Sequence, residues 1–206
     1  MLPADPAATR AKLLQAAGEV FAAQGFQAAT VREICARVDA NVAAVNYHFG
    51  DKAGLYIEVL RRAINGDAEI PLPPDPEEAL RIFIWRMLSR TSLTDQSSLH
   101  FRIMAHEMAR PTPALAQVTA EVIAPKFQQL RRVLGAILEL DPNHPTTVLC
   151  GHSLIGQVMH YANATPVIAI LSPELQQDPD RLARVANHIT NFTLHALRAI
   201  CKGASL

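Results

Sequence analysis

The sequence predicts an all-α fold in two parts, a small N-terminal domain of short helices and a larger C-terminal helical domain. Apolar residues recur at intervals of three and four along most of the chain, which is the period of helices with one buried face. No segment shows the alternation of apolar and polar residues that is typical of a half-buried strand. Glycine is scarce, with nine in 206 residues, so long helices can run uninterrupted.

The first helix is expected to end at Gly25, because glycine readily adopts the left-handed conformation that closes a helix. Its buried side is marked by five apolar residues at helical spacing: Leu13, Leu14, Ala17, Val20 and Phe21. The second helix begins at Thr30, where "TVRE" forms a capping box. The Thr30 side chain accepts from the amide of Glu33, and the Glu33 carboxylate accepts from the amide of Thr30.

The turn "VDAN" at residues 38–41 ends this short second helix. Asp39 tolerates the left-handed conformation better than most residues, and Asn41 can cap the helix that follows. A third helix is predicted over residues 42–48, before Gly50 breaks it.

Asp51 caps a fourth helix, whose buried side is marked by Leu55, Tyr56, Val59 and Leu60. The segment 65–79 holds four prolines and is the predicted boundary between two domains, 1–66 and 75–206. Pro125 must kink or interrupt the helix that contains it. Longer helices are predicted beyond the boundary at 76–92, 97–109, 113–139, 144–162 and 179–202.

Two short helices joined by a four-residue turn, the first of them capped by threonine, have the geometry of a helix-turn-helix. Only the first turns of the second helix need to enter the major groove of DNA. A helix over residues 42–48 is roughly 10 Å long at 1.5 Å per residue, and the groove is about 12 Å wide. The pattern favours a DNA-binding N-terminal domain of three helices.

The side chains of this helix suit contact with DNA. Its first turn is small and apolar, which allows close approach and contact with thymine methyl groups: Val42, Ala43 and Ala44. Asn46 can make a two-point amide contact with adenine. Tyr47 and His48 carry donors suited to phosphate oxygens.

Lys52 adds a positive charge near the start of the fourth helix, where helix-end amides favour an anion. Phe49, four residues after Val45, is expected to face the core of the small domain instead. The bland alternative is that Tyr47 and His48 are ordinary surface residues. The net charge does not distinguish DNA contact from an ordinary surface, since seven basic and six acidic residues leave only +1 over residues 1–66.

Residues 9–56, "TRAKLLQAAGEVFAAQGFQAATVREICARVDANVAAVNYHFGDKAGLY", resemble the N-terminal domain of TetR/AcrR-type transcriptional regulators. The segment "ANVAAVNYHFGDK" is similar to the CecR-like branch, in which asparagine replaces the commoner tyrosine at position 46. In the C-terminal part, "EMARPTPAL" and "VIAPKFQQLRRVL" resemble the same branch.

The resemblance implies a homodimer that binds a palindromic double-stranded DNA operator and usually represses transcription. Asp39 departs from the family pattern, which has glycine in the turn; an acidic group there weakens phosphate binding unless it points away or pairs with Arg37. Thr30 falls at the phosphate-binding start of the second helix. The family's DNA-contacting positions are occupied by Arg32, Val42, Ala43, Asn46, Tyr47, His48 and Lys52.

The resemblance also implies that the C-terminal helices dimerise and enclose a pocket for a small-molecule effector. Small residues on helix 144–162 permit close approach of another helix: Gly151, Ser153 and Gly156. Helix 179–202 offers an apolar stripe: Leu182, Val185, Ile189, Phe192, Leu197 and Ile200. The alternative is that these residues pack only within one monomer.

Soft and aromatic residues are the candidates for lining the effector pocket, although each can equally be plain core: Trp85, Met87, Phe101, Met104, Phe127 and Tyr161. No metal or cofactor is expected. The histidine pairs on one helix are six, eight or seven residues apart: His100 and His106, His152 and His160, His188 and His195. Helical two-histidine ligation needs three or four. Cys35, Cys150 and Cys201 read as free thiols.

The N-terminus lacks the pattern of a signal peptide, and no apolar run approaches the ~20 residues of a membrane span. A cytoplasmic protein is therefore expected. Two rival functions stay open. An all-α enzyme acting on a small hydrophobic molecule requires convergent catalytic groups, and "GHSLIG" at 151–156 lacks the strand and second glycine of a nucleophile elbow. An all-α small-molecule-binding or interaction protein without DNA binding requires no reading helix.

Overall fold

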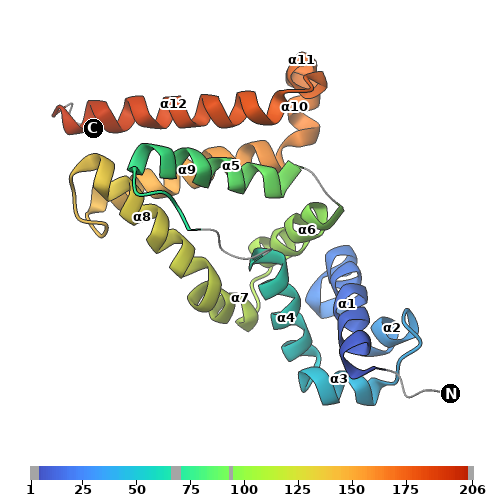
Figure 1. Ribbon diagram of the computed structural model, residues 1–206. Coiled ribbons are helices and arrows are strands. Elements are labelled where there is room, and N and C mark those ends of the chain that lie inside the picture. The colour runs from blue at the N-terminus through green and yellow to red at the C-terminus, as the bar shows by residue number, and fades with distance from the viewer. Residues whose placement is uncertain (1–4, 66–70, 93–94, 204–206) are drawn as a thin grey trace. The chain divides into compact units, whose positions relative to one another are not determined.

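The computed structural model describes residues 5–65, 71–92 and 95–203, and within these ranges the chain forms helices and no strands (Figure 1). The predicted all-α class is confirmed. The helices, in chain order, are α1 (Pro6–Ala28), α2 (Val31–Ala36), α3 (Val42–Phe49), α4 (Lys52–Asn65), α5 (Pro76–Ser92), α6 (Asp95–Ala109), α7 (Pro113–Val118), the π-helix η1 (Thr119–Ile123), α8 (Ala124–Leu138), α9 (Pro145–Asn163), α10 (Thr165–Leu171), α11 (Pro173–Gln177) and α12 (Arg181–Cys201).

The chain forms two compact units. Unit 1 comprises residues 1–68 and 95–124, and unit 2 comprises 69–94 and 125–206. Helices α6, α7 and η1 thus pack with the N-terminal helices, although they follow the proline-rich segment in the sequence. A functional division at 1–66 and 75–206 stays a prediction, because packing alone does not assign a function to either part.

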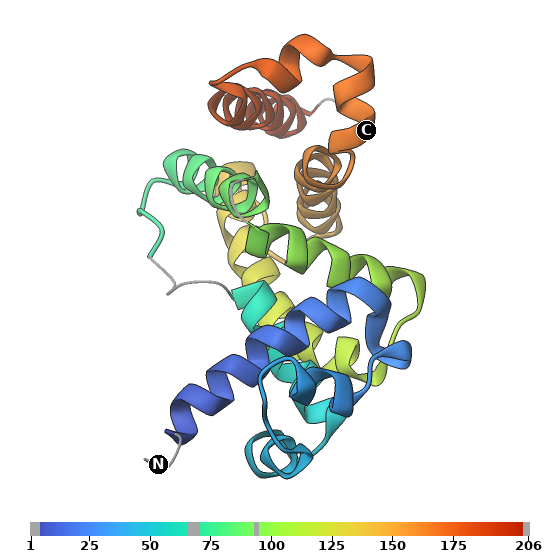
Figure 2. The same ribbon diagram turned by 90° about the vertical axis from the view of Figure 1, so that its right-hand side faces the viewer.

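In unit 1, α1 packs against α4 and α6, as both views display (Figure 1, Figure 2). The predicted stripes of α1 and α4 are buried in one core with Ile34, Val45 and Ile103. Tyr56 meets the ring of Phe21 edge-on with centroids 4.7 Å apart, and lies 4.9 Å from that of Phe26. This aromatic group fixes α4 against α1.

Gly25 interrupts the first helix as predicted, with φ of 75° and ψ of 174°. The helix resumes for a short stretch and ends at Ala28 rather than at the glycine itself. A side chain at residue 25 would be strained in this conformation, and its Cβ would meet the ring of His106 on α6 at 3.1 Å. Gly25 therefore serves both the turn and the close approach of α6.

In unit 2, α5, α8, α9 and α12 surround a core that includes Leu80, Leu134 and Ile189. The predicted helix over 113–139 is divided into α7, η1 and α8. The π-helical turn ends two residues before Pro125. This proline has no backbone N–H to donate in an α-helical hydrogen bond. The predicted interruption at this proline is confirmed.

Helix α12 uses most of its apolar stripe within unit 2. Val185, Ile189 and Leu197 are buried, and α12 packs against α5. Most of the stripe is thus core of a single unit rather than a free surface, and a role of α12 in a dimer stays a prediction. Phe192 is the member that stays exposed, at 59%. Gly151 is buried too, since a Cβ there would meet Phe127 at 2.9 Å.

Within the described ranges, no single helix is both long and apolar enough to cross a membrane. Helices α9 and α10 reach the required length and composition only as a pair, and the pair is bent by 77°.

Candidate nucleic-acid interface

Helices α2 and α3 form a helix-turn-helix whose two N-termini are capped as the sequence predicts. The Thr30 hydroxyl accepts from the amide of Glu33 at 3.2 Å, and the Asn41 side chain accepts from the amide of Ala43 at 3.0 Å. The reciprocal half of the capping box is absent from the described contacts. The Glu33 carboxylate instead accepts from the Gln24 amide at 2.7 Å and pairs with Arg37 at 3.3 Å, so it ties α2 to α1.

Asp39 adopts the predicted left-handed conformation in the turn, with φ of 52°. Arg37 lies 3.3 Å from Glu33 and 3.6 Å from Glu19. The described ion pairs of Arg37 thus engage those two carboxylates rather than Asp39, which is exposed. The acidic group in the turn thus lies at the surface, where a negative side chain is unfavourable beside phosphates.

Helix α3 has one buried face and one exposed face. Val45 is fully buried and Phe49 is 9% exposed, as their four-residue spacing predicts. Asn46 and Tyr47 are on the exposed side, and Tyr47 is 80% exposed. A tyrosine so exposed contributes little to the core of unit 1. We call the exposed residues Val42, Ala43, Asn46 and Tyr47 the reading face.

The other candidate DNA contacts flank the reading face. Thr30 and Arg32 are exposed on α2, and His48 is partly exposed. The ring of Tyr47 meets that of His48 edge-on at 4.8 Å. Lys52 is partly buried: its ammonium lies 4.6 Å from the ring centroid of Phe26 and donates to the Gln27 carbonyl at 3.4 Å. This fixes one charge at the start of α4. The DNA-contacting role of all eight residues stays a prediction.

The junction between α3 and α4 contains a close backbone contact that is not among the predicted features. Gly50 ends α3 with φ of 80°, and the Asp51 carboxylate accepts from the amide of Gly54 at 2.8 Å. A Cβ at Gly54 would overlap the Phe49 carbonyl oxygen and lie 3.2 Å from the carbonyl carbon. A glycine inside a helix costs about 1 kcal/mol relative to alanine, and that was the available signal. Arg10, whose guanidinium lies 5.1 Å from the centroid of Phe49, was missed too.

A hydrogen-bonded group also holds α4 to α1 and η1. Glu58 accepts from Arg10 of α1 at 2.7 Å and from Arg61 at 2.6 Å, and Arg61 donates to Glu121 of η1 at 2.5 Å. Burial raises the pKa of Glu58, but the hydrogen bonds and charges of both arginines outweigh burial and leave this pKa below its usual range.

The candidate pocket residues are divided between the two units, and a pocket lined by all six stays a prediction. Trp85 is 44% exposed, Met87 packs on the core of unit 2, and Met104 packs on the core of unit 1. The Phe127 ring lies against Gly151 and is 4.7 Å from the ring of His152. The side chain of Phe101 lies outside the described residues. Helical periodicity marks an apolar side as buried but does not distinguish core from cavity wall.

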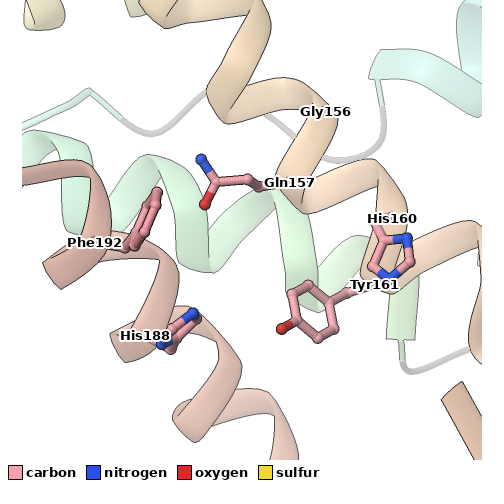
Figure 3. Close-up of a pocket in the computed structure, with 6 residues that line it drawn as sticks. All are labelled: Gly156, Gln157, His160, Tyr161, His188 and Phe192. Atoms are coloured by element: carbon pink, nitrogen blue, oxygen red, sulfur yellow. The ribbon is translucent and has the colours of Figure 1, made fainter. Parts of the chain in front are cut away.

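Unit 2 has a groove of about 440 Å³ between α9 and α12 (Figure 3). Tyr161 is the candidate pocket residue that lines it, and its ring projects toward the α12 side of the groove in the figure. The lining residues are Gly156, Gln157, His160, Tyr161, His188 and Phe192. Nothing in the sequence marks Gln157 for a role, and the spacing of His160 and His188 from the other histidines on their helices does not predict a metal site. A Cβ at Gly156 would meet no atom within 4 Å. The groove is therefore open to the surface of unit 2.

A capped helix-turn-helix whose second helix has an exposed face is typical of DNA-binding regulators. Comparison with protein families agrees. The family model described as "Bacterial regulatory proteins, tetR family" matches residues 13–59. The model for the C-terminal domain of the HTH-type transcriptional dual regulator CecR matches residues 76–197. The chain belongs to the TetR family of transcriptional regulators, in its CecR-like branch.

Individual relatives support this assignment. The dual regulator CecR of Shigella flexneri is 29% identical over 166 residues, covering 73% of this chain and 74% of CecR. The transcriptional repressor NicS of Pseudomonas putida is 35% identical over 85 residues, covering 37% of this chain and 40% of NicS.

Solved structures share the fold. A linker-substituted mutant of HlyIIR superposes with a TM-score of 0.66 at 20% identity, covering 91% of this chain and all of that one. NalD, the secondary repressor of the MexAB-OprM multidrug efflux pump in Pseudomonas aeruginosa, has a TM-score of 0.60 at 21% identity, with 93% and 97% covered.

Proposed function

We propose that this TetR-family regulator is a homodimeric repressor that binds a palindromic operator through α3 and leaves it when a small molecule binds. The observation that supports this most is the division of α3 into a buried side and the reading face. Eight residues at 1.5 Å each make α3 roughly 12 Å long, which matches the ~12 Å width of the major groove.

Within this proposal the residues have separate duties. Asn46 makes the two-point contact with an adenine, and Val42 and Ala43 approach thymine methyl groups. Tyr47 and Lys52 contact phosphates, where they position the helix without reading sequence. Thr30, Arg32 and His48 add phosphate contacts from the start of α2 and the end of α3. No catalytic step is part of the proposal.

The dimer is proposed to form through the exposed side of α9. This 19-residue helix contains no Asp, Glu, Lys or Arg. Part of it nevertheless faces solvent, since the side chain of Leu149 is 64% exposed. Depletion of charge is the compositional mark of the core of a protein interface. Gly156 on α9 and Phe192 on α12 border the same groove. Two α9 helices and two α12 helices would then form a four-helix bundle.

The effector is proposed to act by binding more tightly to a dimer state whose two α3 helices are not one DNA turn, about 34–36 Å, apart. The names of the relatives differ in the direction of regulation, since CecR is called a dual regulator and NicS a repressor. A reporter fused to the regulated promoter distinguishes repression from activation.

The experiment is a fluorescence-anisotropy titration of the full chain with duplexes from the DNA flanking its own gene, over several salt concentrations. A complex that is sequence-selective and weakens with salt is expected. Tyr47→Ala and Lys52→Ala should each weaken it across sequences, and Lys52→Ala should reduce the slope of log K against log salt by about 1.

Arg132→Ala is the control, because Arg132 is an exposed base on α8 in unit 2 and removal of its charge should leave the slope unchanged. An all-α small-molecule-binding protein without DNA binding would give a wild-type chain with no selective complex on any flanking duplex. That result would refute the proposal.

A further inference from the structure

Glu107 on α6 is a buried carboxylate whose partners come from two other parts of unit 1. Its exposure is 1%, and it is the one acidic residue among the buried polar residues that the structure describes. An ionised carboxylate is strongly disfavoured away from water unless hydrogen bonds or a cation satisfy it. Such a group therefore needs a specific arrangement of donors around it.

Three donors converge on this carboxylate. The Tyr56 hydroxyl on α4 donates to Oε1 at 2.6 Å, and the Thr112 hydroxyl donates to the same oxygen at 2.9 Å. The Thr112 amide donates to Oε2 at 2.9 Å. Within the described part of the chain no ion pair includes Glu107, so these donors take the place of a cation. We call Glu107, Tyr56 and Thr112 the carboxylate latch.

Tyr56 is held in its role as a donor. Burial raises the pKa of its phenol, and the hydrogen bond to Glu107 and the charge of that residue raise it further. The phenol therefore stays protonated at neutral pH and remains a donor. Hydrogen bonds to an ionised acceptor are directional and strong, so they define the position of α4 against α6 more sharply than apolar packing alone.

The latch lies close in the chain to the reading face. α4 begins at Lys52, three residues after α3 ends at Phe49, and Tyr56 is one turn further along. The overlap that any Cβ at Gly54 would make with the Phe49 carbonyl leaves no room between the end of α3 and the start of α4. A displacement of α4 at Tyr56 would therefore reach α3 through this contact.

Thr112 is the residue before α7, so two of the three donors depend on the turn between α6 and α7. A movement of that turn removes both Thr112 donors from Glu107 together. The carboxylate then lacks the donors that its burial requires. Tyr56 would then be the one donor left to it among the described contacts, so Glu107 joins α4 and the α6–α7 turn through a single carboxylate.

We propose that Glu107 is a positioning residue for operator recognition: through Tyr56 it sets α4, and with it α3, in the arrangement that reads DNA. This inference rests on the proposed function. It assigns the preference for the operator over other DNA to a defined hydrogen bond, the one from Tyr56 to Glu107 that holds α4 against α6.

The test compares Glu107→Gln and Tyr56→Phe with wild type in the full chain. Affinity for a selected flanking duplex and for a scrambled duplex is measured at a temperature where circular dichroism shows each variant fully folded. Both variants should bind the selected duplex at least fivefold more weakly and the scrambled duplex within twofold of wild type. The double variant should lose little more than either single one, because both changes break the same contact.

Glu77→Gln is the matched control. Glu77 also ties two helices, accepting from Arg198 at 2.7 and 2.9 Å, but it does so in unit 2, and both affinities should stay within twofold. If Glu107→Gln does not fold, Tyr56→Phe decides alone, since it removes one oxygen and leaves both Thr112 bonds.

The inference is overturned if wild type prefers the selected duplex and Tyr56→Phe retains that preference within twofold, whatever its thermal stability. If wild type shows no preference for any flanking duplex, the proposed function fails first and the positioning role fails with it.

Discussion

Gly54→Ala tests the close contact between α3 and α4, because two physical effects of this substitution have opposite signs. Alanine is favoured over glycine inside a helix by about 1 kcal/mol, which alone would stabilise α4. The new Cβ, however, would lie 3.2 Å from the Phe49 carbonyl carbon. Carbon atoms in contact prefer about 3.5–4.0 Å. The end of α3 would therefore have to retreat by roughly 0.3–0.8 Å, and further at the carbonyl oxygen.

The net effect follows from the two magnitudes. Overpacking costs about 1–3 kcal/mol, and the upper end applies because the obstacle is backbone, which cannot rotate away. Subtraction of the helix-propensity gain of about 1 kcal/mol leaves a loss of about 2 kcal/mol. For a chain of this length that lowers Tm by roughly 4–8 °C. Because α3 is displaced, the affinity for operator DNA should fall as well.

The assay is urea unfolding followed by far-ultraviolet circular dichroism, with operator affinity measured on the folded protein. Ala53→Ser is the control, because Ala53 is the exposed neighbour on the same turn and the change should alter stability by no more than about 0.5 kcal/mol. A Gly54→Ala protein that is as stable as wild type, or more stable, would refute the reasoning, since helix propensity would then be the only effect at work.

Two further predictions concern the ties around α4 and the proposed dimer surface. Glu58 has a folded pKa below its usual range, so its contribution to stability is present above the ordinary glutamate pKa of about 4.3 and is lost as pH falls through the lowered folded value. Glu58→Gln should therefore be less stable than wild type at pH 7 and should lose less stability on acidification below pH 4.3. Urea midpoints measured at several pH values test this. Midpoints that change in parallel with pH for the two proteins would contradict it. The new Cβ of Gly156→Ala would meet no atom of its own unit within 4 Å, so the substitution should stabilise an isolated monomer slightly. Because the same Cβ would obstruct a second α9, it should raise the dimer dissociation constant in analytical ultracentrifugation. An unchanged dissociation constant would exclude close approach of the partner at this point of α9.

The helices of this protein could be predicted from the sequence because they depend on local signals. The capping role of Thr30, the left-handed Asp39 and the interruption before Pro125 each follow from one residue and its neighbours. The four-residue spacing from Val45 predicts that Phe49 lies in the core, and the structure confirms it.

Contacts between distant segments could not be predicted in the same way. Nothing near Glu107 in the sequence indicates that Tyr56, 51 positions away, donates to it. The sequence predicts a dimer surface along the apolar stripe of α12, whereas Val185 and Ile189 are buried within unit 2, where α12 packs against α5 and α9. Periodicity states which side of a helix is buried, but the partner that buries it is a property of the tertiary fold.

The central claim is that the reading face of α3 lies in the major groove, and the most direct measurement pairs a protein change with a base change. Each adenine in the selected duplex is replaced in turn by 7-deazaadenine, which lacks the N7 acceptor. The affinity of wild type and of Asn46→Ala is measured for each modified duplex. At one adenine in each half-site the base change removes one of the two hydrogen bonds, so it should weaken wild-type binding by about 0.5–1.5 kcal/mol and leave Asn46→Ala binding unchanged. If every 7-deazaadenine weakens both proteins equally, Asn46 does not read that edge of the base and the claim is contradicted.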